Sequence, residues 1–126
     1  MVRLLIIGCG GFVGAILRYW ISGWVYGWSG GDFPLGTLSV NLLGSFVLGV
    51  VLGLADHLVV HPQLMLFLTI GLLGAFTTFS TFSFETWALI EVGSIGRAVL
   101  NMGLSLGVGL LAVFFGLVAG RAVGMV

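Results

Sequence analysis

The chain has 126 residues, of which 60% are hydrophobic and 6% are charged, and its mean hydropathy is +1.28. A soluble globular domain carries about 25% charged residues, so this composition excludes a soluble protein and predicts an integral membrane protein. The formal net charge is zero, which excludes a basic face for nucleic acid and a polybasic patch for anionic lipid. Cys9 is the single cysteine and cannot form a disulfide within the chain.

Four apolar ranges are each long enough to cross a membrane, which takes about 20 residues. They cover residues 4–26, 35–55, 63–92 and 98–119. The turn-rich sequences W-S-G-G-D-F-P and D-H-L-V-V-H-P follow the first and the second range. Because the connections are short, the sequence predicts an all-α integral membrane protein in which residues 1–126 form one domain of four transmembrane helices.

The third apolar range is too long for one straight membrane helix. A helix over residues 63–92 would reach about 45 Å at ~1.5 Å per residue, whereas the hydrocarbon core is about 30 Å thick. The middle of the range holds T-T-F-S-T-F-S, residues 77–83, in which hydroxyls alternate with aromatic rings. We therefore expect a broken third helix with an unwound turn near residues 76–78, which is tolerated at membrane depth only inside protein or beside a wet cavity.

The basic residues give no orientation signal. Four spans put Arg3 and Arg121 on one side of the membrane and Arg97, with Arg18 if it reaches the surface, on the other, and the chain contains no lysine. The positive-inside rule needs an excess of Lys and Arg on one side. Dual topology follows, with an antiparallel homodimer around a two-fold axis in the membrane plane. The alternative is a single orientation set by other signals.

Small and polar residues recur every four positions in three of the spans. The second span carries such a stripe at Thr37, Asn41, Ser45, Gly49 and Gly53. The fourth span carries a shorter one at Asn101, Ser105 and Gly109, and the first span has Gly10 and Gly14 at this interval. The spacing puts each set on one helix face. We interpret the glycines as helix-packing residues. The two asparagines are either interhelical hydrogen-bonding residues or parts of a polar track, because an unpartnered amide in hydrocarbon is costly.

The polar groups of these spans favour a small anion. The first, second and fourth spans contain no acidic residue and no lysine, the groups on which proton-coupled exchange and cation pathways commonly depend. Amide and hydroxyl donors remain, together with phenyl rings, whose edges are electropositive. Phe79 and Phe82 are three residues apart after the break and share a helix face, although plain core packing is the alternative for these rings. The freed carbonyls around Gly74–Thr77 favour a sodium ion, most simply a structural one.

Three motifs carry a family resemblance: G-G-F-V-G-A-I-L-R-Y at residues 10–19, G-T-L-S-V-N-L-L-G-S-F at 36–46 and G-A-F-T-T-F-S-T-F-S at 74–83. Together they resemble the Fluc (CrcB) family of bacterial fluoride channels. The resemblance implies an antiparallel dual-topology homodimer with two fluoride pores. It implies that pore-lining groups come from Asn41, Phe79, Phe82, Ser80, Thr81, Thr37 and Ser105, with Phe79 and Phe82 in each pore supplied by different subunits.

The same resemblance assigns further residues. It implies that the main-chain carbonyls of Gly74 and Thr77 hold a central sodium ion, and that Arg18 lies near the aqueous vestibule. Glu85 matches an acidic position near the pore exit, and an interfacial carboxylate is the alternative interpretation of this residue. Asn101 matches a position that varies between polar and aromatic residues among members, so it carries no assigned role.

The predicted function is passive, electrogenic efflux of fluoride across the cytoplasmic (inner) membrane, with fluoride and membrane lipid as partners and no enzymatic activity. The alternatives are a proton-coupled small four-helix transporter and a membrane assembly protein that transports nothing. Asp56, His57 and His61 lie close together in the second loop, but we interpret them as interfacial residues and expect no zinc site.

Overall fold

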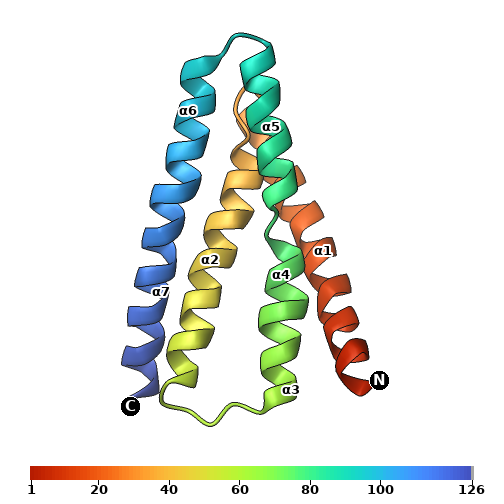
Figure 1. The fold of residues 1–126 in the computed structure, drawn as a ribbon, viewed down its shortest axis with the longest axis vertical. Coiled ribbons are helices and arrows are strands. Elements are labelled where there is room, and N and C mark those ends of the chain that lie inside the picture. Colours follow the sequence, from red (N-terminus) through yellow and green to blue (C-terminus); the bar gives the residue numbers. More distant parts are fainter. Residues whose placement is uncertain (126) are drawn as a thin grey trace.

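The computed structural model describes residues 1–125, which form four long helices and their short connections (Figure 1). The first two are α1 (Val2–Ser29) and α2 (Leu35–Ala55). The third consists of α3 (Pro62–Met65), the π-helical segment η1 (Leu66–Leu73), α4 (Gly74–Phe76) and α5 (Phe79–Glu91). The fourth consists of α6 (Ile95–Gly103), the π-helical η2 (Leu104–Val108) and α7 (Gly109–Gly124).

All four helices are long and apolar enough to cross a membrane, which confirms the predicted all-helical membrane fold. Both termini lie at the same end of the molecule, at the bottom of Figure 1, together with the connection between α2 and α3. The first and fourth helices are longer than the apolar ranges in the sequence, and α1 ends only where Gly30 adopts φ +76°. Where the hydrocarbon core begins along each helix stays a prediction.

The third helix is interrupted between α4 and α5. Thr77 has φ −84° and ψ 156°, and Thr78 has φ −148° and ψ 117°, so both residues are extended. Thr78 then caps α5, because its Oγ1 accepts a hydrogen bond from the Thr81 amide. Threonine is a favoured N-cap residue for this reason.

Glycines allow the helices to approach at backbone distance. A Cβ added to Gly10 of α1 would lie 2.5 Å from the Phe67 carbonyl of η1, and one added to Gly53 of α2 would lie 2.5 Å from the Leu117 carbonyl of α7. The same closeness is found at Gly14, Gly49, Gly116 and Gly120. The prediction that the glycines at residues 10, 14, 49 and 53 pack helices is therefore confirmed.

Few side chains are buried inside the single chain. Its buried hydrophobic residues, among those described, are Leu38, Val40, Leu73, Phe76 and Ala98. Large apolar side chains cover the outside instead, as in the stripe Trp20, Trp24 and Trp28 near one end of α1. An outward apolar surface is stable only against lipid or another apolar chain, so this arrangement agrees with a multi-pass membrane protein.

Candidate functional site

Asn41 of α2 binds the backbone at the interruption of the third helix. Its Nδ2 donates to the Thr78 carbonyl at 3.0 Å, and its Oδ1 accepts from the Thr78 amide at 2.7 Å. One side-chain amide thus pairs with both peptide groups of the residue that precedes α5. The same amide Nδ2 carries a second hydrogen, because a primary amide has two donors.

The two carbonyls assigned to a sodium ion have lost their helical donors. In a continuous helix the Thr78 amide would donate to the Gly74 carbonyl, but it donates to Asn41 Oδ1 instead. The Thr81 amide would likewise donate to the Thr77 carbonyl, but it donates to Thr78 Oγ1 at 3.3 Å. Gly74 and Thr77 therefore lie among the residues whose carbonyl oxygens the interruption frees, and a cation site there stays a prediction.

Thr78 is the centre of a small hydroxyl cluster. Its Oγ1 lies 3.0 Å from Thr81 Oγ1 and 3.3 Å from Ser80 Oγ. Ser80 and Thr81 are both exposed in the single chain, so their hydroxyls are accessible from the side of α5. The cluster brings together three hydroxyls of the T-T-F-S-T-F-S stretch within one helical turn.

A cavity of about 290 Å³ lies between α2, the interruption, α5 and η2. The polar groups around it come from six residues: Asn41, Ser45, Thr69, Thr77, Thr78 and Ser105. Ser105 Oγ is buried and has no hydrogen-bond partner among the described residues. No charged residue lines this cavity in the part of the chain that the structure describes.

The two phenyl rings of α5 border the same cavity. Their ring centroids are 5.6 Å apart with an interplanar angle of 45°, so Phe79 and Phe82 do share one helix face as the spacing predicts. Phe79 is 77% exposed in the single chain, whereas Phe82 is half-buried. Most of the Phe79 ring therefore makes no contact within the single chain.

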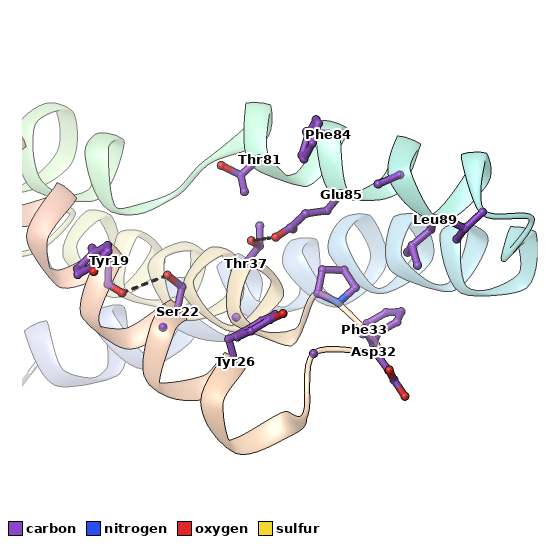
Figure 2. Close-up of a pocket in the computed structure, with 16 residues that line it drawn as sticks. Tyr19, Ser22, Tyr26, Asp32, Phe33, Thr37, Thr81, Phe84, Glu85 and Leu89 are labelled. Carbon is purple, nitrogen blue, oxygen red and sulfur yellow. Dashed lines mark hydrogen bonds between the residues drawn. The ribbon is translucent and has the colours of Figure 1, made fainter.

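Two further cavities lie on the other side of Thr78. The smaller, about 190 Å³, is lined by Arg18, Thr37, Thr78 and Thr81 among others. The larger, about 540 Å³, lies between α1, the connection 30–34 and α5 (Figure 2). Thr37 and Thr81 line both of these cavities, and Thr78 lines both the 190 Å³ and the 290 Å³ cavity. The 190 Å³ cavity therefore adjoins both others, sharing Thr78 with one and Thr37 and Thr81 with the other.

The larger cavity is lined by Glu85 of α5, whose carboxylate contacts α2. Thr37 Oγ1 donates to Glu85 Oε1 at 2.8 Å, as Figure 2 shows. Glu85 Oε2 is buried and has no hydrogen-bond partner among residues 1–125. Glu85 thus lines this cavity and bonds α2, and its role at a pore exit stays a prediction.

The structure brings most of the predicted site residues together. All of them except Ser80 line one of the three cavities, and Ser80 bonds Thr78, which lines two of them. Asn101 is different, because it is 1% exposed and donates to Thr86 at 2.9 Å. The sequence interpretation missed Thr78, Thr69 and Tyr19. An N-cap signal, threonine before a new half-helix with a hydroxyl three residues later, could have identified Thr78.

No zinc site is found in the second loop. The described residues contain no group of three His, Cys, Asp or Glu side chains close enough to hold a metal ion. His61 Nδ1 instead accepts a hydrogen bond from the Gln63 amide and caps α3. Asp56 pairs with Arg121 Nε at 2.8 Å. These contacts give Asp56 and His61 structural partners.

Comparison with known proteins identifies the family. Residues 5–117 match the family described as CrcB-like protein, Camphor Resistance (CrcB). The chain belongs to this family. It is 46% identical over 122 residues to the "Fluoride-specific ion channel FluC" of Hydrogenovibrio crunogenus, covering 96% of this chain and 92% of the relative. It is 45% identical over 120 residues to the protein of the same name from Thermus thermophilus, covering 95% of this chain and 94% of the relative.

Other relatives of the CrcB family agree with this assignment. The "Fluoride-specific ion channel FluC" of Sulfurovum sp. is 50% identical over 114 residues, covering 90% of each chain. These comparisons confirm the resemblance drawn from the three motifs. They also confirm that the chain is not an enzyme, because the relatives are named as ion channels.

Proposed function

We propose that this chain forms a fluoride-selective channel that conducts fluoride passively and electrogenically. The observation that carries the proposal is the 290 Å³ cavity, which has hydroxyls, an amide and phenyl rings on its walls and no charged residue among its described lining. The names of the relatives supply the ion. Fluoride is small and strongly hydrated, so close hydrogen-bond donors must replace its water at each step. Fixed positive charges would hold the ion too tightly for conduction.

The direction of transport follows from membrane voltage. From an acidic medium, fluoride enters the cell as neutral HF, which dissociates in the less acidic interior. An open anion pathway in the cytoplasmic (inner) membrane then lowers the internal fluoride concentration, because the negative interior favours exit by ~2.3 kcal/mol per charge per 100 mV. Neither a nucleotide site nor a proton relay is required for this function.

A homodimer completes the pathway. Phe79 is 77% exposed on the same face as Phe82, so a second copy that covers this face would enclose the 290 Å³ cavity. We propose an antiparallel dual-topology pair in which each of two pores takes Phe79 from one subunit and Phe82 from the other. Asn41, Ser105 and the Thr78 cluster line the route, and membrane lipid covers the remaining apolar surface.

A structural sodium ion fits the interruption. The Gly74 and Thr77 carbonyls have lost their helical donors to Asn41 and to the Thr78 hydroxyl. Unwound carbonyls of broken membrane helices coordinate alkali cations. If the interruption lies at membrane depth on the dimer axis, two copies bring four such oxygens together, and the bound cation would hold the two subunits in register.

The smaller cavity, of about 190 Å³, fits the mouth of the pathway. Arg18 supplies a positive charge beside Thr37 and Thr81, where an anion would arrive from water. Thr37 also lines the larger cavity, where its hydroxyl donates to Glu85 at 2.8 Å. We propose that Arg18 attracts the anion into the vestibule and that Thr37 and Glu85 form the pore exit.

A liposome flux assay tests the function. Purified protein is reconstituted into vesicles loaded with fluoride, and efflux is followed with a fluoride electrode after valinomycin is added to carry potassium. We expect rapid efflux that depends on valinomycin and needs no pH gradient. Efflux that requires a proton gradient would support the proton-coupled transporter, and no efflux would support an assembly protein.

A further inference from the structure

A buried hydrogen-bond chain joins the fourth helix to the second half of the third. Asn101 Nδ2 of α6 donates to Thr86 Oγ1 of α5 at 2.9 Å, and Thr86 Oγ1 donates to the Phe82 carbonyl at 2.7 Å. Asn101 is 1% exposed and Thr86 is 6% exposed, although the chain is a single copy here. These two polar side chains are therefore buried by their own chain, and their burial does not depend on a second subunit.

The direction of the chain is fixed by the hydrogens available. A threonine hydroxyl has one hydrogen, and Thr86 uses it on the Phe82 carbonyl. Its oxygen therefore accepts from Asn101. In hydrocarbon no water can replace either partner, so an unpaired amide or hydroxyl at this depth is costly. The contact consequently holds α5 and α6 at one separation and one register.

Both members of the pair lie one turn from a residue that borders the 290 Å³ cavity. Phe82 precedes Thr86 by four residues on α5, and Ser105 follows Asn101 by four residues along the fourth helix. Residues four apart lie on the same helix face. Phe82 and Ser105 line the cavity, whereas Asn101 and Thr86 do not. Since α5 and α6 run in opposite directions (Figure 1), both cavity residues lie on the same side of the pair.

We propose that Asn101 and Thr86 form an interhelical clamp that sets the separation between the Phe82 ring and the Ser105 hydroxyl. The clamp is not part of the pore surface. It acts as a positioning pair that fixes how closely a ring edge and a hydroxyl approach the ion from opposite sides. Its consequence for conduction rests on the proposed fluoride channel, whereas its effect on the position of the ring does not.

The test uses three variants of the full-length protein. Thr86→Val removes the hydroxyl and keeps the side-chain shape, and Thr86→Ser restores the hydroxyl. Ser83→Ala is the matched control, because Ser83 Oγ also donates to a carbonyl four residues earlier on α5, that of Phe79 at 2.9 Å, but is exposed. Each variant is measured for unitary fluoride conductance in planar bilayers, for melting temperature in detergent, and for the ¹⁹F spectrum of 4-fluorophenylalanine placed at position 82.

We expect Thr86→Val to lower the unitary conductance several-fold and to shift the ¹⁹F signal, while Thr86→Ser and Ser83→Ala keep both near the parent values. Unitary conductance counts only open, folded channels, so lost stability alone would not change it. An unchanged ¹⁹F signal in Thr86→Val would overturn the clamp. A shifted signal with unchanged conductance would overturn its role in setting the pore. If the parent protein conducts no fluoride, the proposed function fails, and the ¹⁹F comparison still decides whether the clamp positions the ring.

Discussion

The side-chain amide of Asn41 has two proposed roles, to hold the backbone at Thr78 and to bind the ion. Both of its polar atoms pair with the Thr78 peptide, and its remaining Nδ2 hydrogen is the one left for an ion. We expect Asn41→Leu to abolish fluoride flux and also to lower the free energy of unfolding, by about 1–3 kcal/mol for each buried peptide group left unpaired. Thermal melting of the purified protein and fluoride efflux are measured on the same preparation.

Leu43→Ala is the matched control for this change, because Leu43 lies on the same helix and is 45% exposed. It should leave the flux unchanged. If Asn41→Leu loses flux but melts at the parent temperature, the structural half of this prediction is wrong. Asn41 would then serve only to contact the ion and would not stabilise the interruption.

The two phenyl rings of α5 test the ring-edge chemistry. Phe79 and Phe82 border a cavity without charged residues among its described lining, and in the proposed mechanism their electropositive edges take the place of charges there. We expect Phe79→Ile and Phe82→Ile each to reduce fluoride efflux strongly, because isoleucine keeps apolar bulk but has no ring edge. Size-exclusion chromatography should show an unchanged oligomer. Efflux at the parent rate in both variants would contradict the ring-edge mechanism.

The elements also approach closely where α2 meets the interruption. A Cβ added to Gly44 would lie 3.0 Å from Phe76 Cδ1 and closer still to Thr77 Cγ2. We expect Gly44→Ala to push α4 and the interruption away from α2 and to cost about 1–3 kcal/mol of stability, the usual range for overpacking. Chemical or thermal unfolding in detergent measures this effect.

Gly27→Ala serves as the comparison, because nothing lies within 4 Å of a Cβ at Gly27. Alanine there should leave stability unchanged or raise it slightly, since glycine costs a helix up to about 1 kcal/mol relative to alanine. Equal losses in the two variants would contradict the assignment, because helix propensity favours alanine at both positions and the close contact exists only at Gly44.

Two kinds of contact join α2 to α7, and we expect them to contribute unequally to stability. A Cβ added to Gly116 would lie 3.0 Å from the Val50 amide and 3.1 Å from Gly49 Cα. The Asp56–Arg121 ion pair joins the same two helices at 2.8 Å, but its side chains are 48% and 53% exposed. We expect Gly116→Ala to lower the melting temperature clearly and Asp56→Asn to cost at most about 1 kcal/mol, as exposed ion pairs do. A larger loss in Asp56→Asn would reverse this ranking.

The residue pattern predicts some features of the helices and not others. Hydropathy is a property of each segment alone, so it identifies the four membrane-length helices, and small residues at a spacing of four identify the faces of Gly10, Gly14, Gly49 and Gly53 that pack. The excess length of the third apolar range pointed to residues 76–78, and Thr77 and Thr78 are the extended residues.

Contacts that depend on pairing between helices could not be predicted in this way. The spacing put Asn41 and Asn101 on similar polar stripes, but one binds a backbone at the interruption and the other binds Thr86 inside the subunit. Neither partner is set by the asparagine's own helix. The π-helical turns of η1 and η2 were missed for the same reason, because their residues are ordinary apolar helix formers.

At the scale of the whole molecule, the distribution of arginines bears on orientation. Arg3 and Arg121 lie at the end with the two termini, and Arg97 lies near the opposite end, where α5 connects to α6 (Figure 1). Arg18 lines the 190 Å³ cavity, and Arg121 is paired with Asp56. With the arginines so evenly divided, a single added charge should set the orientation.

We expect Val59→Lys, at a fully exposed residue of the termini end, to hold that end in the cytoplasm. Gly96→Lys, at an exposed residue of α6 with open space around it, should hold the opposite end there. Each variant alone would then lack its antiparallel partner and lose fluoride flux, whereas co-expression should restore it. Orientation is read by labelling intact cells with a membrane-impermeant maleimide at Met125→Cys, in a Cys9→Ala background.

The co-expressed pair is the decisive arm of this experiment. Restored flux requires that the two oppositely inserted chains meet, because neither conducts alone. If a variant that labels in one orientation only still conducts at the parent rate, the subunits do not need to be antiparallel. The two-fold axis in the membrane plane would then be wrong, and with it the sharing of Phe79 and Phe82 between subunits and the cation site made of two interruptions.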